Sequence, residues 1–269
     1  MLKLAESEAE LAVSGSTPFG CKILSAAAAY GVRNRNARFW SQESEGRLPD
    51  GVRLPGGPVL GMLDDTVLLE AGGGEGSSWE EIAAFVRALG PRVFSCEEGA
   101  AEKLGFEPSS RGEIMVLRRR DFPEVSADVE WDPSPREIYS LLERSKTATF
   151  HPPEFEPFYM DLSYRTRHGA AAAACVRKNT LPASCAVCTS LTSTAAVISG
   201  VACAPEFRGR GLAGAAVLAL ARRLGRENIY IFRADRENAG FYHALGFEPY
   251  GRWVECIGND AASETKIYP

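Results

Sequence analysis

The sequence predicts an α/β protein with a mixed sheet, built from two similar halves. Two observations support this fold class. Apolar, strand-like runs alternate with segments of helical spacing along the chain, as in layered α/β architectures. In addition, the pentapeptide Leu-Gly-Phe-Glu-Pro occurs at residues 104–108 and again at 245–249, which indicates an internal repeat.

The same order of elements precedes each copy of the pentapeptide: strand, helix, short strand and short helix. In the first half we predict these at Pro58–Leu69, Ser78–Leu89, Arg92–Cys96 and Gly99–Leu104. In the second half we predict them at Ala195–Cys203, Leu212–Leu224, Ile229–Phe232 and Ala239–Leu245. A strand at Glu113–Arg118 closes the first half, and a helix at Arg136–Glu143 follows the linker. Residues Arg33–Pro58, rich in Gly, Arg, Asn and Pro, are predicted to be irregular.

The repeat divides the chain into two predicted domains, residues 1–123 and 124–269. Aligning the two pentapeptides puts Ala101 opposite Tyr242. The first half also carries the loop Gly72–Gly76, which holds glycines but includes Glu75, a charge that repels anions. We therefore expect the first domain to be a degenerate copy that packs on the second and helps to shape its cleft.

Composition narrows the class of protein. The 269 residues carry a formal net charge of -5, which argues against nucleic-acid binding by the chain as a whole. Met1–Val13 lacks the apolar run of a signal peptide, and no apolar stretch reaches the length of a membrane span. Seven cysteines are typical of reduced thiols here, so we expect a cytoplasmic protein. Cys185 and Cys188 form a CxxC without further ligands nearby, so we predict no metal site.

The segment Val201–Gly214 has the properties of an anion site. A predicted strand ends at Cys203, a turn containing Gly209 and Gly211 follows, and a predicted helix begins at Leu212. The first N–H groups of a helix lack intrahelical partners, and the helix dipole adds partial positive charge there. Arg208 and Arg210 add full charges. Together these features predict a phosphate-binding turn.

Two motifs in this half resemble a known family. Arg208-x-x-Gly211-x-Ala213 resembles the Arg/Gln-x-x-Gly-x-Gly/Ala signature of the GNAT superfamily of N-acetyltransferases. Residues 238–247, Asn-Ala-Gly-Phe-Tyr-His-Ala-Leu-Gly-Phe, resemble the family's Asn…Ala…Tyr…Leu-Gly-Phe element. The resemblance covers roughly residues 125–256. Together with the repeat, it implies tandem GNAT-like domains, each a mixed and mostly antiparallel sheet flanked by helices.

The resemblance implies acetyl-CoA as co-substrate, with its pyrophosphate in the turn. The residues it implies for cofactor binding are Val201, Ala202, Cys203, Arg208, Gly209, Arg210, Gly211, Leu212, Ala213, Asn238, Phe241 and Tyr242. Tyr242 is also the implied catalytic acid, which protonates the departing thiolate. We expect Asn238 to cap its helix and Gly246 to end it in a left-handed conformation. Phe241 and Leu245 should face the core, with Tyr242 rotated off that side towards the cofactor sulfur.

The implied reaction is direct attack on the thioester by a primary amine of a small molecule or peptide. Many family members carry a glutamate base on the strand before the turn, but Ala186–Ala204 contains no acid and no histidine. The acceptor contacts expected instead, four of them also candidate bases, are Glu154, Glu156, Tyr159, Asp161 and His168. The alternative interpretation of residues 151–159 is a packed connecting loop.

Two other functions fit parts of the pattern. A non-catalytic acyl-CoA-binding sensor or scaffold would use the same turn without needing Tyr242. Aminoacyl transfer from tRNA by a tandem GNAT-like protein is disfavoured by the net charge and by the intact pyrophosphate motif. As partners we therefore expect an amine acceptor, but neither nucleic acid nor membrane. The chain is expected to be a monomer with an internal pseudo-dimer, or a homodimer.

Overall fold

The computed structural model describes residues 2–11, 13–42, 57–72, 78–118, 127–147, 150–235 and 238–257. Contacts divide the chain into two compact units. Unit 1 comprises Met1–Ile114 and Tyr250–Thr265, and unit 2 comprises Met115–Pro249 and Lys266–Pro269. The domain boundary predicted between residues 123 and 124 lies outside the described residues.

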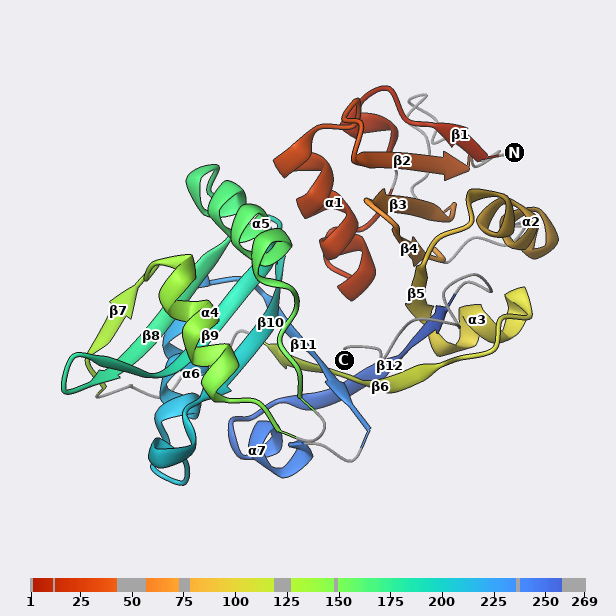
Figure 1. The fold of residues 1–269 in the computed structure, drawn as a ribbon. Helices are drawn as coiled ribbons and strands as arrows, with labels where there is room; N and C mark the ends of the chain where they lie inside the picture. The colour runs from red at the N-terminus through yellow and green to blue at the C-terminus, as the bar shows by residue number, and fades with distance from the viewer. Residues whose placement is uncertain are drawn as a thin grey trace. The chain divides into compact units, whose positions relative to one another are not determined.

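Unit 1 is a mixed sheet flanked by helices (Figure 1). Its elements are β1 (Leu2–Leu4), α1 (Pro18–Tyr30), β2 (Ala37–Gln42), β3 (Val59–Leu63), β4 (Thr66–Glu70), α2 (Trp79–Leu89), β5 (Val93–Glu97) and α3 (Glu98–Leu104). The strand order is β1-β2-β3-β4-β5-β12, where β12 spans Glu248–Ile257. Strands β4 and β5 are parallel, whereas β1–β2, β2–β3, β3–β4 and β5–β12 are antiparallel.

Two expectations for this unit are wrong. The single strand predicted at Pro58–Leu69 is a hairpin of β3 and β4, and its turn contains Asp64 with φ 51. The segment predicted to be irregular contains β2, in which Ala37 and Phe39 are buried. The helix predicted from Ser78 is confirmed, because the Ser78 hydroxyl caps α2 by accepting a hydrogen bond from the Glu81 N–H.

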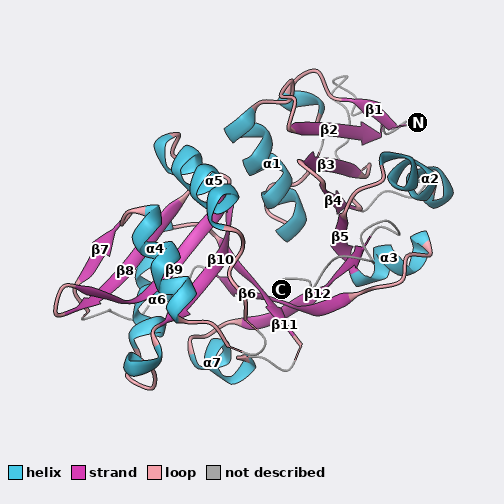
Figure 2. Cartoon of the chain, in the orientation of Figure 1, coloured by secondary structure: helices cyan, strands magenta, loops and turns pink. Residues whose placement is uncertain are grey.

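Unit 2 has the same architecture (Figure 2). Its elements are β7 (Val129–Trp131), α4 (Pro135–Arg144), α5 (Phe155–Arg167), β8 (Ala172–Lys178), β9 (Leu181–Leu191), β10 (Ala195–Cys203), α6 (Leu212–Leu224), β11 (Asn228–Ala234) and α7 (Ala239–Ala244). The strand order is β6-β11-β10-β9-β8-β7, where β6 spans Ser110–Arg118. The antiparallel run β7-β8-β9-β10 is followed by the parallel pair β10–β11. The mixed, mostly antiparallel sheet predicted for the second half is therefore confirmed.

The sheet of unit 2 buries two apolar clusters, one on each face, because neighbouring side chains of a strand point to opposite sides. The cluster under α6 includes Ile198, Leu220 and Ile231. The cluster under α4 and α5 includes Leu141 and Leu162. Cys185 belongs to the second cluster and Cys188 to the first, so the two cysteines of the CxxC point to opposite faces of the sheet.

All seven cysteines are free thiols, and within the described ranges no group of three His, Cys, Asp or Glu side chains could hold a metal ion. None of the helices in the described part of the chain combines the length and apolar character needed to cross a bilayer.

Candidate cofactor site

The parallel pair β10–β11 separates before its strands end. Its register runs from Ala195 opposite Asn228 to Ile198 opposite Ile231, yet β10 continues to Cys203. Irregularities in the pairing with β9, near Ile198 and Gly200, accompany the divergence. The C-terminal part of β10 therefore has a side that β11 does not occupy. Val201, Ala202 and Cys203, which the resemblance implies for cofactor binding, lie on this part of β10.

The turn between β10 and α6 leaves backbone donors available. Gly209 and Gly211 both have φ 73, a left-handed conformation that side chains other than glycine adopt at a cost. Gly211 is the N-cap of α6 and provides no capping side chain. Among the described residues, no acceptor faces the N–H groups of residues 209–214. With the partial positive charge of the helix end, these amides can bind an anion.

The two arginines of the motif are held by the protein itself. The Arg208 guanidinium donates from Nε to the Cys203 carbonyl and from Nη2 to the Ser145 carbonyl, both at 3.1 Å. Arg210 donates from Nη2 to the Glu206 carbonyl at 3.1 Å. The sequence suggested that both charges face the ligand. Instead, each side chain uses part of its donor set to hold the turn, and their positive charge remains beside it.

Helix α7 approaches the first turn of α6 closely, and Gly214 makes this possible. A Cβ atom at Gly214 would lie 2.9 Å from Leu245 Cδ2 and 3.9 Å from Phe241 Cε2. Gly214 lies outside both family motifs. Its signal was available, because a small residue in the first turn of a helix permits close packing of a second helix. Gly214 thus fixes the position of α7, which carries Tyr242, relative to the phosphate turn.

Tyr242 is half-buried at the edge of the α6 cluster. Its ring packs edge-on against Phe241 and Phe247, with centroid distances of 4.9 and 5.6 Å. Burial raises the pKa of the phenol to about 12, partly offset by the positive charge of Arg233. The expectation that Tyr242 turns off the core side is wrong, since it packs on the cluster together with Leu245. Its hydroxyl has no hydrogen-bond partner among the described residues.

Of the two residues predicted to end α7, Asn238 and Gly246, only Gly246 has the predicted geometry. Asn238 does occupy the N-cap, but with φ 53 and without a hydrogen bond from its side chain to the helix. The expectation of a side-chain cap is therefore wrong, and Asn238 instead provides a left-handed residue before the helix, which asparagine tolerates. Gly246 has φ 90 after the helix, so the predicted positive φ is confirmed.

The candidate acceptor residues lie at and along α5, on the opposite sheet face from α6. Glu154 is the exposed N-cap of α5, and Glu156 is exposed in its first turn. Tyr159 packs 4.8 Å from the Arg136 guanidinium, and Asp161 pairs with the buried Arg165 at 2.8 Å. His168 stacks on Tyr164, and its Nδ1 lies 2.8 Å from the Tyr164 carbonyl. All five residues therefore lie on α5 or at its ends. The alternative interpretation of residues 151–159, a packed connecting loop, applies only to the residues before α5.

Unit 1 contains the corresponding parallel pair, β4 and β5, with α2 between them. The N-terminal end of α2, however, is capped by a side chain. Ser78 caps α2, and Glu80 and Glu81 place two carboxylates in its first turn. At the end of β4, Glu70 Oε2 accepts hydrogen bonds from the Gly20 N–H at 3.0 Å and from the Thr17 hydroxyl at 2.9 Å. The donors of α2 that an anion would need are partly occupied, and the local charge is negative. Residues 73–77 of the glycine loop lie outside the described residues.

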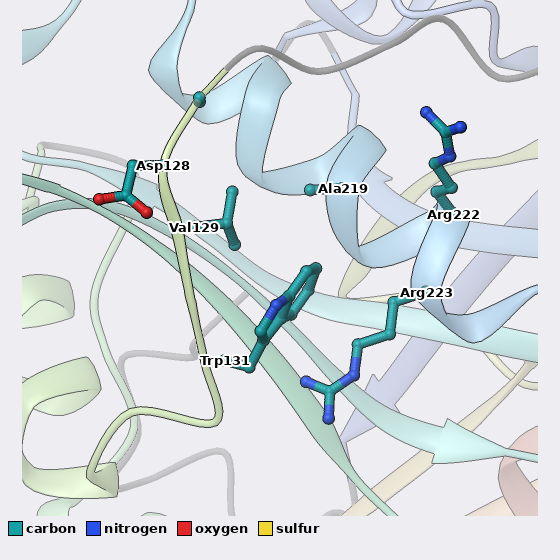
Figure 3. A pocket seen from close by; sticks show the side chains of 7 residues that line it. Asp128, Val129, Trp131, Ala219, Arg222 and Arg223 are labelled. Carbon is teal, nitrogen blue, oxygen red and sulfur yellow. The ribbon is translucent and has the colours of Figure 1, made fainter.

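A surface pocket of about 380 Å³ lies elsewhere on unit 2 (Figure 3). It is formed by β7 with the residues before it and by the last turns of α6, and its lining residues are Ala127, Asp128, Val129, Trp131, Ala219, Arg222 and Arg223. The Arg223 guanidinium lies 4.7 Å from the Trp131 ring centroid and pairs with Asp132 at 2.8 Å. Gly211 and Arg222 are roughly 16 Å apart along the helix, at about 1.5 Å per residue. The pocket is therefore distinct from the phosphate turn.

The sequence of the C-terminal half matches a known protein-family model. A model of the Acetyltransferase (GNAT) family matches residues 136–247, which include α4 to α7 and the phosphate turn. Residues 136–247 are thus similar to the domain that defines the GNAT family. Members of this family bind acyl-CoA, and the match supports an acyltransferase in general without naming the acceptor. Among proteins with curated functions, none matches the sequence of the chain significantly.

Solved structures extend the similarity to the whole chain. A tandem GNAT protein from the clavulanic acid biosynthesis pathway, solved without acetyl-CoA, is 17% identical with a TM-score of 0.56, covering 95% of this chain and 97% of that one. A GCN5-related N-acetyltransferase from Sphaerobacter thermophilus is 15% identical with a TM-score of 0.53, covering 95% and 94%. A GNAT-family acetyltransferase from Colwellia psychrerythraea is 12% identical with a TM-score of 0.54, covering 96% and 100%. At these identities the similarity establishes the fold, a tandem of GNAT-like domains.

Proposed function

We propose that unit 2 transfers an acetyl group from acetyl-CoA to a primary amine of a small molecule or peptide by direct attack. The observation that carries the proposal is the glycine-capped start of α6, with amides that face no acceptor among the described residues beside the diverging end of β10. These amides fit the pyrophosphate of coenzyme A, because backbone N–H groups at a helix end bind phosphates well. The diverging end of β10 leaves room for the extended arm of the donor.

The residues have distinct roles in the proposed reaction. N–H groups near Val201 to Cys203 polarise the thioester carbonyl, and preorganised donors are commonly the largest electrostatic contribution to acyl transfer. The amine nitrogen forms the new bond to the carbonyl carbon, and the carbon–sulfur bond breaks. Tyr242 donates its phenolic proton to the departing thiolate, and the proton that the acylated nitrogen loses restores the phenol. Its raised pKa keeps the phenol protonated throughout the neutral range.

The acceptor amine must be neutral when it attacks. At pH 7 a lysine ε-amine with a pKa of about 10.4 costs roughly 4.6 kcal/mol to deprotonate, whereas an α-amine near 7.8 costs only about 1 kcal/mol. Since β10 carries no carboxylate, we infer an amine of low pKa, or a base from α5 and its ends: Glu154, Glu156, Asp161 or His168. The Asp161 carboxylate already pairs with Arg165 within α5.

Calorimetric titration of the full chain with acetyl-CoA tests the proposal. We expect one site per chain, because the helix end in unit 1 is capped and negatively charged. Gly211→Ala should weaken binding at least tenfold, since its φ of 73 shapes the turn. Gly225→Ala is the matched control: it places a comparable strain, φ 60, at the other end of the same helix and should leave binding unchanged. Two sites per chain would show that unit 1 also binds, and no binding would refute the proposal.

The main alternative is a non-catalytic acyl-CoA sensor or scaffold. It predicts the same stoichiometry and the same effect of Gly211→Ala. It also predicts that no amine, screened as α-amino acids, polyamines and short peptides, becomes acetylated. Acetylation that depends on Tyr242 would exclude it.

A further inference from the structure

Strand β7 forms one edge of its sheet, and part of its backbone is directed away from the sheet. Within the described ranges β7 pairs with β8 alone. Asp132, directly after the strand, donates its N–H to the Ala173 carbonyl at 2.9 Å, which makes these two residues a hydrogen-bonded pair. Such pairs alternate along antiparallel strands, so Glu130 also directs its backbone groups to β8. The N–H and C=O groups of Val129 and Trp131 therefore point outwards, where no described strand meets them.

The two faces of β7 differ in polarity, because its side chains alternate across the sheet. Val129 packs against the apolar cluster under α6, and the Trp131 ring centroid lies 4.7 Å from the Arg223 guanidinium in the last turn of that helix. Asp128 and Glu130 belong to the opposite face. Figure 3 shows Val129 and Trp131 directed towards α6 and Asp128 directed away from it. One face of the strand is thus apolar and the other acidic.

Negative charge exceeds positive charge on the acidic face. Arg177 forms ion pairs with both Glu130 and Glu137, so a single guanidinium serves two carboxylates. Asp128 is exposed and forms no ion pair with any described residue. Opposite charges on directly facing strands attract, whereas like charges repel. A strand added at this edge is therefore favoured when it carries basic side chains on this face.

The apolar face of β7 opens onto the surface pocket of about 380 Å³ beside α6 (Figure 3). Trp131 is 42% exposed there, although tryptophan is highly buried on average. Directly opposite side chains of paired strands lie about 5 Å apart. Apolar side chains of an added strand would therefore cover Trp131 and Val129 and enter the pocket, which removes apolar surface from water.

The charges of β7 disfavour a second copy of the chain as the occupant of this edge. Two copies of β7 could pair antiparallel only with their outward groups, those of Val129 and Trp131, facing each other. Every such register also places at least one of Asp128, Glu130 and Asp132 opposite an acidic residue of the copy. Like charges directly opposite each other are destabilising. The edge therefore fits a strand of different sequence.

We propose that the outer edge of β7 binds an extended peptide in which basic residues alternate with apolar ones. The peptide adds to the sheet as a further strand, so that backbone hydrogen bonds to Val129 and Trp131 supply affinity and the alternating side chains supply specificity. Its apolar side chains lie beside Trp131 in the pocket, and its basic side chains face Asp128 and Glu130. The surface lies apart from the phosphate turn, so the inference does not depend on the proposed function.

Fluorescence anisotropy tests the inference, with a labelled octapeptide of alternating lysine and valine titrated with the full chain at low salt. We expect saturable binding, about tenfold tighter than that of an octapeptide of alternating glutamate and valine. Val129→Pro removes an outward N–H and leaves the bonds to β8 in place, so it should weaken binding about tenfold relative to Val129→Ala. Val129→Ala is the matched control, because it loses the same side-chain contacts but keeps the N–H.

Asp128→Lys tests the acidic face through an exposed side chain. It should lower the preference for the lysine–valine peptide about threefold. Equal binding of the two peptides by the wild type, or equal binding by Val129→Pro and Val129→Ala, would overturn the inference. So would absence of peptide binding, and a dimer that Val129→Pro dissociates would then assign the edge to a second copy. Should Val129→Pro not fold, Asp128→Lys decides, because an unchanged preference in that variant would contradict the role of the acidic face.

Discussion

Replacing Tyr242 with phenylalanine removes one oxygen from the proposed active site and little else. The edge-on contacts with Phe241 and Phe247 involve the ring, which the variant retains. Because the hydroxyl has no hydrogen-bond partner among the described residues, its loss leaves no buried donor or acceptor unsatisfied there. We therefore expect the free energy of unfolding and the acetyl-CoA affinity to stay nearly unchanged. Turnover, which needs the phenolic proton, should fall.

The size of that fall follows from the pKa of the phenol. With the pKa raised to about 12, Tyr242 is a weaker acid than a thiol, whose pKa is about 8.5. Complete transfer of the proton to the thiolate is then uphill by about 3.5 pKa units, or on the order of 5 kcal/mol. Tyr242 can assist the departing sulfur mainly by a hydrogen bond, so the contribution should be near the lower end for general acids, about a hundredfold.

Steady-state kinetics with an acetylated amine would measure this effect. We expect kcat of Tyr242→Phe to fall about a hundredfold, with the KM for acetyl-CoA changed less than about twofold. The wild-type profile of kcat against pH should show no loss from ionisation of the phenol below about pH 11, because the raised pKa keeps the proton in place. An unchanged kcat in the variant would refute the assignment of Tyr242 as the acid. A loss of activity centred near pH 9 would refute the raised pKa.

Three further predictions follow from single positions. Gly214→Val should destabilise the protein by about 1–3 kcal/mol and lower turnover by displacing α7, since even a Cβ would lie 2.9 Å from Leu245 Cδ2. The control in thermal unfolding is Gly240→Ala, because nothing lies within 4 Å of its added Cβ. Equal losses of stability in the two variants would contradict the packing argument. At Gly209, with φ 73, asparagine should preserve acetyl-CoA binding better than valine, because asparagine tolerates the left-handed region; calorimetry giving the reverse order would contradict this. Burial, and then the charge of Glu70, raises the pKa of Glu97, so the stability this carboxyl supports is complete below its unfolded pKa and is lost as pH rises through its folded pKa. Glu97→Gln should therefore gain Tm relative to the wild type as pH rises above about 4.5, and a difference independent of pH would contradict it.

The sequence was sufficient for the elements that surround the turn. Strand Ala195–Cys203 and helix Leu212–Leu224 have the predicted bounds, because an unbroken apolar run and glycines at both helix ends are local signals. Strand β2 was missed since Phe39 and Trp40 are adjacent and both buried, which disturbs the alternation of a half-exposed strand. The burial of Trp40 depends on α2, which is distant in sequence.

Side-chain direction at the site could not be predicted in the same way. The contact of Arg208 with Ser145 joins residues far apart in sequence, and the motif gives the type of residue but not its partner. The turn of Tyr242 onto the core cluster likewise depends on Phe247 and on the approach of α7 permitted by Gly214. Local patterns thus predict where donors and charges lie along the chain, whereas tertiary packing decides which of them face a ligand.

Comparison of the two units indicates why one helix end stays open. In unit 2 the N-cap is Gly211, and the first turn of α6 contains no acidic residue. In unit 1 the equivalent helix is α2, where the Ser78 hydroxyl accepts a hydrogen bond from the Glu81 N–H, and Glu80 and Glu81 lie in the first turn. The Ser78 hydroxyl opposes anion binding by occupying a backbone donor, and the carboxylates of Glu80 and Glu81 oppose it independently by repulsion. Ser78→Gly alone should therefore not create a second acetyl-CoA site in calorimetry, and a stoichiometry of two in that variant would show that the cap, and not the charge, keeps unit 1 closed.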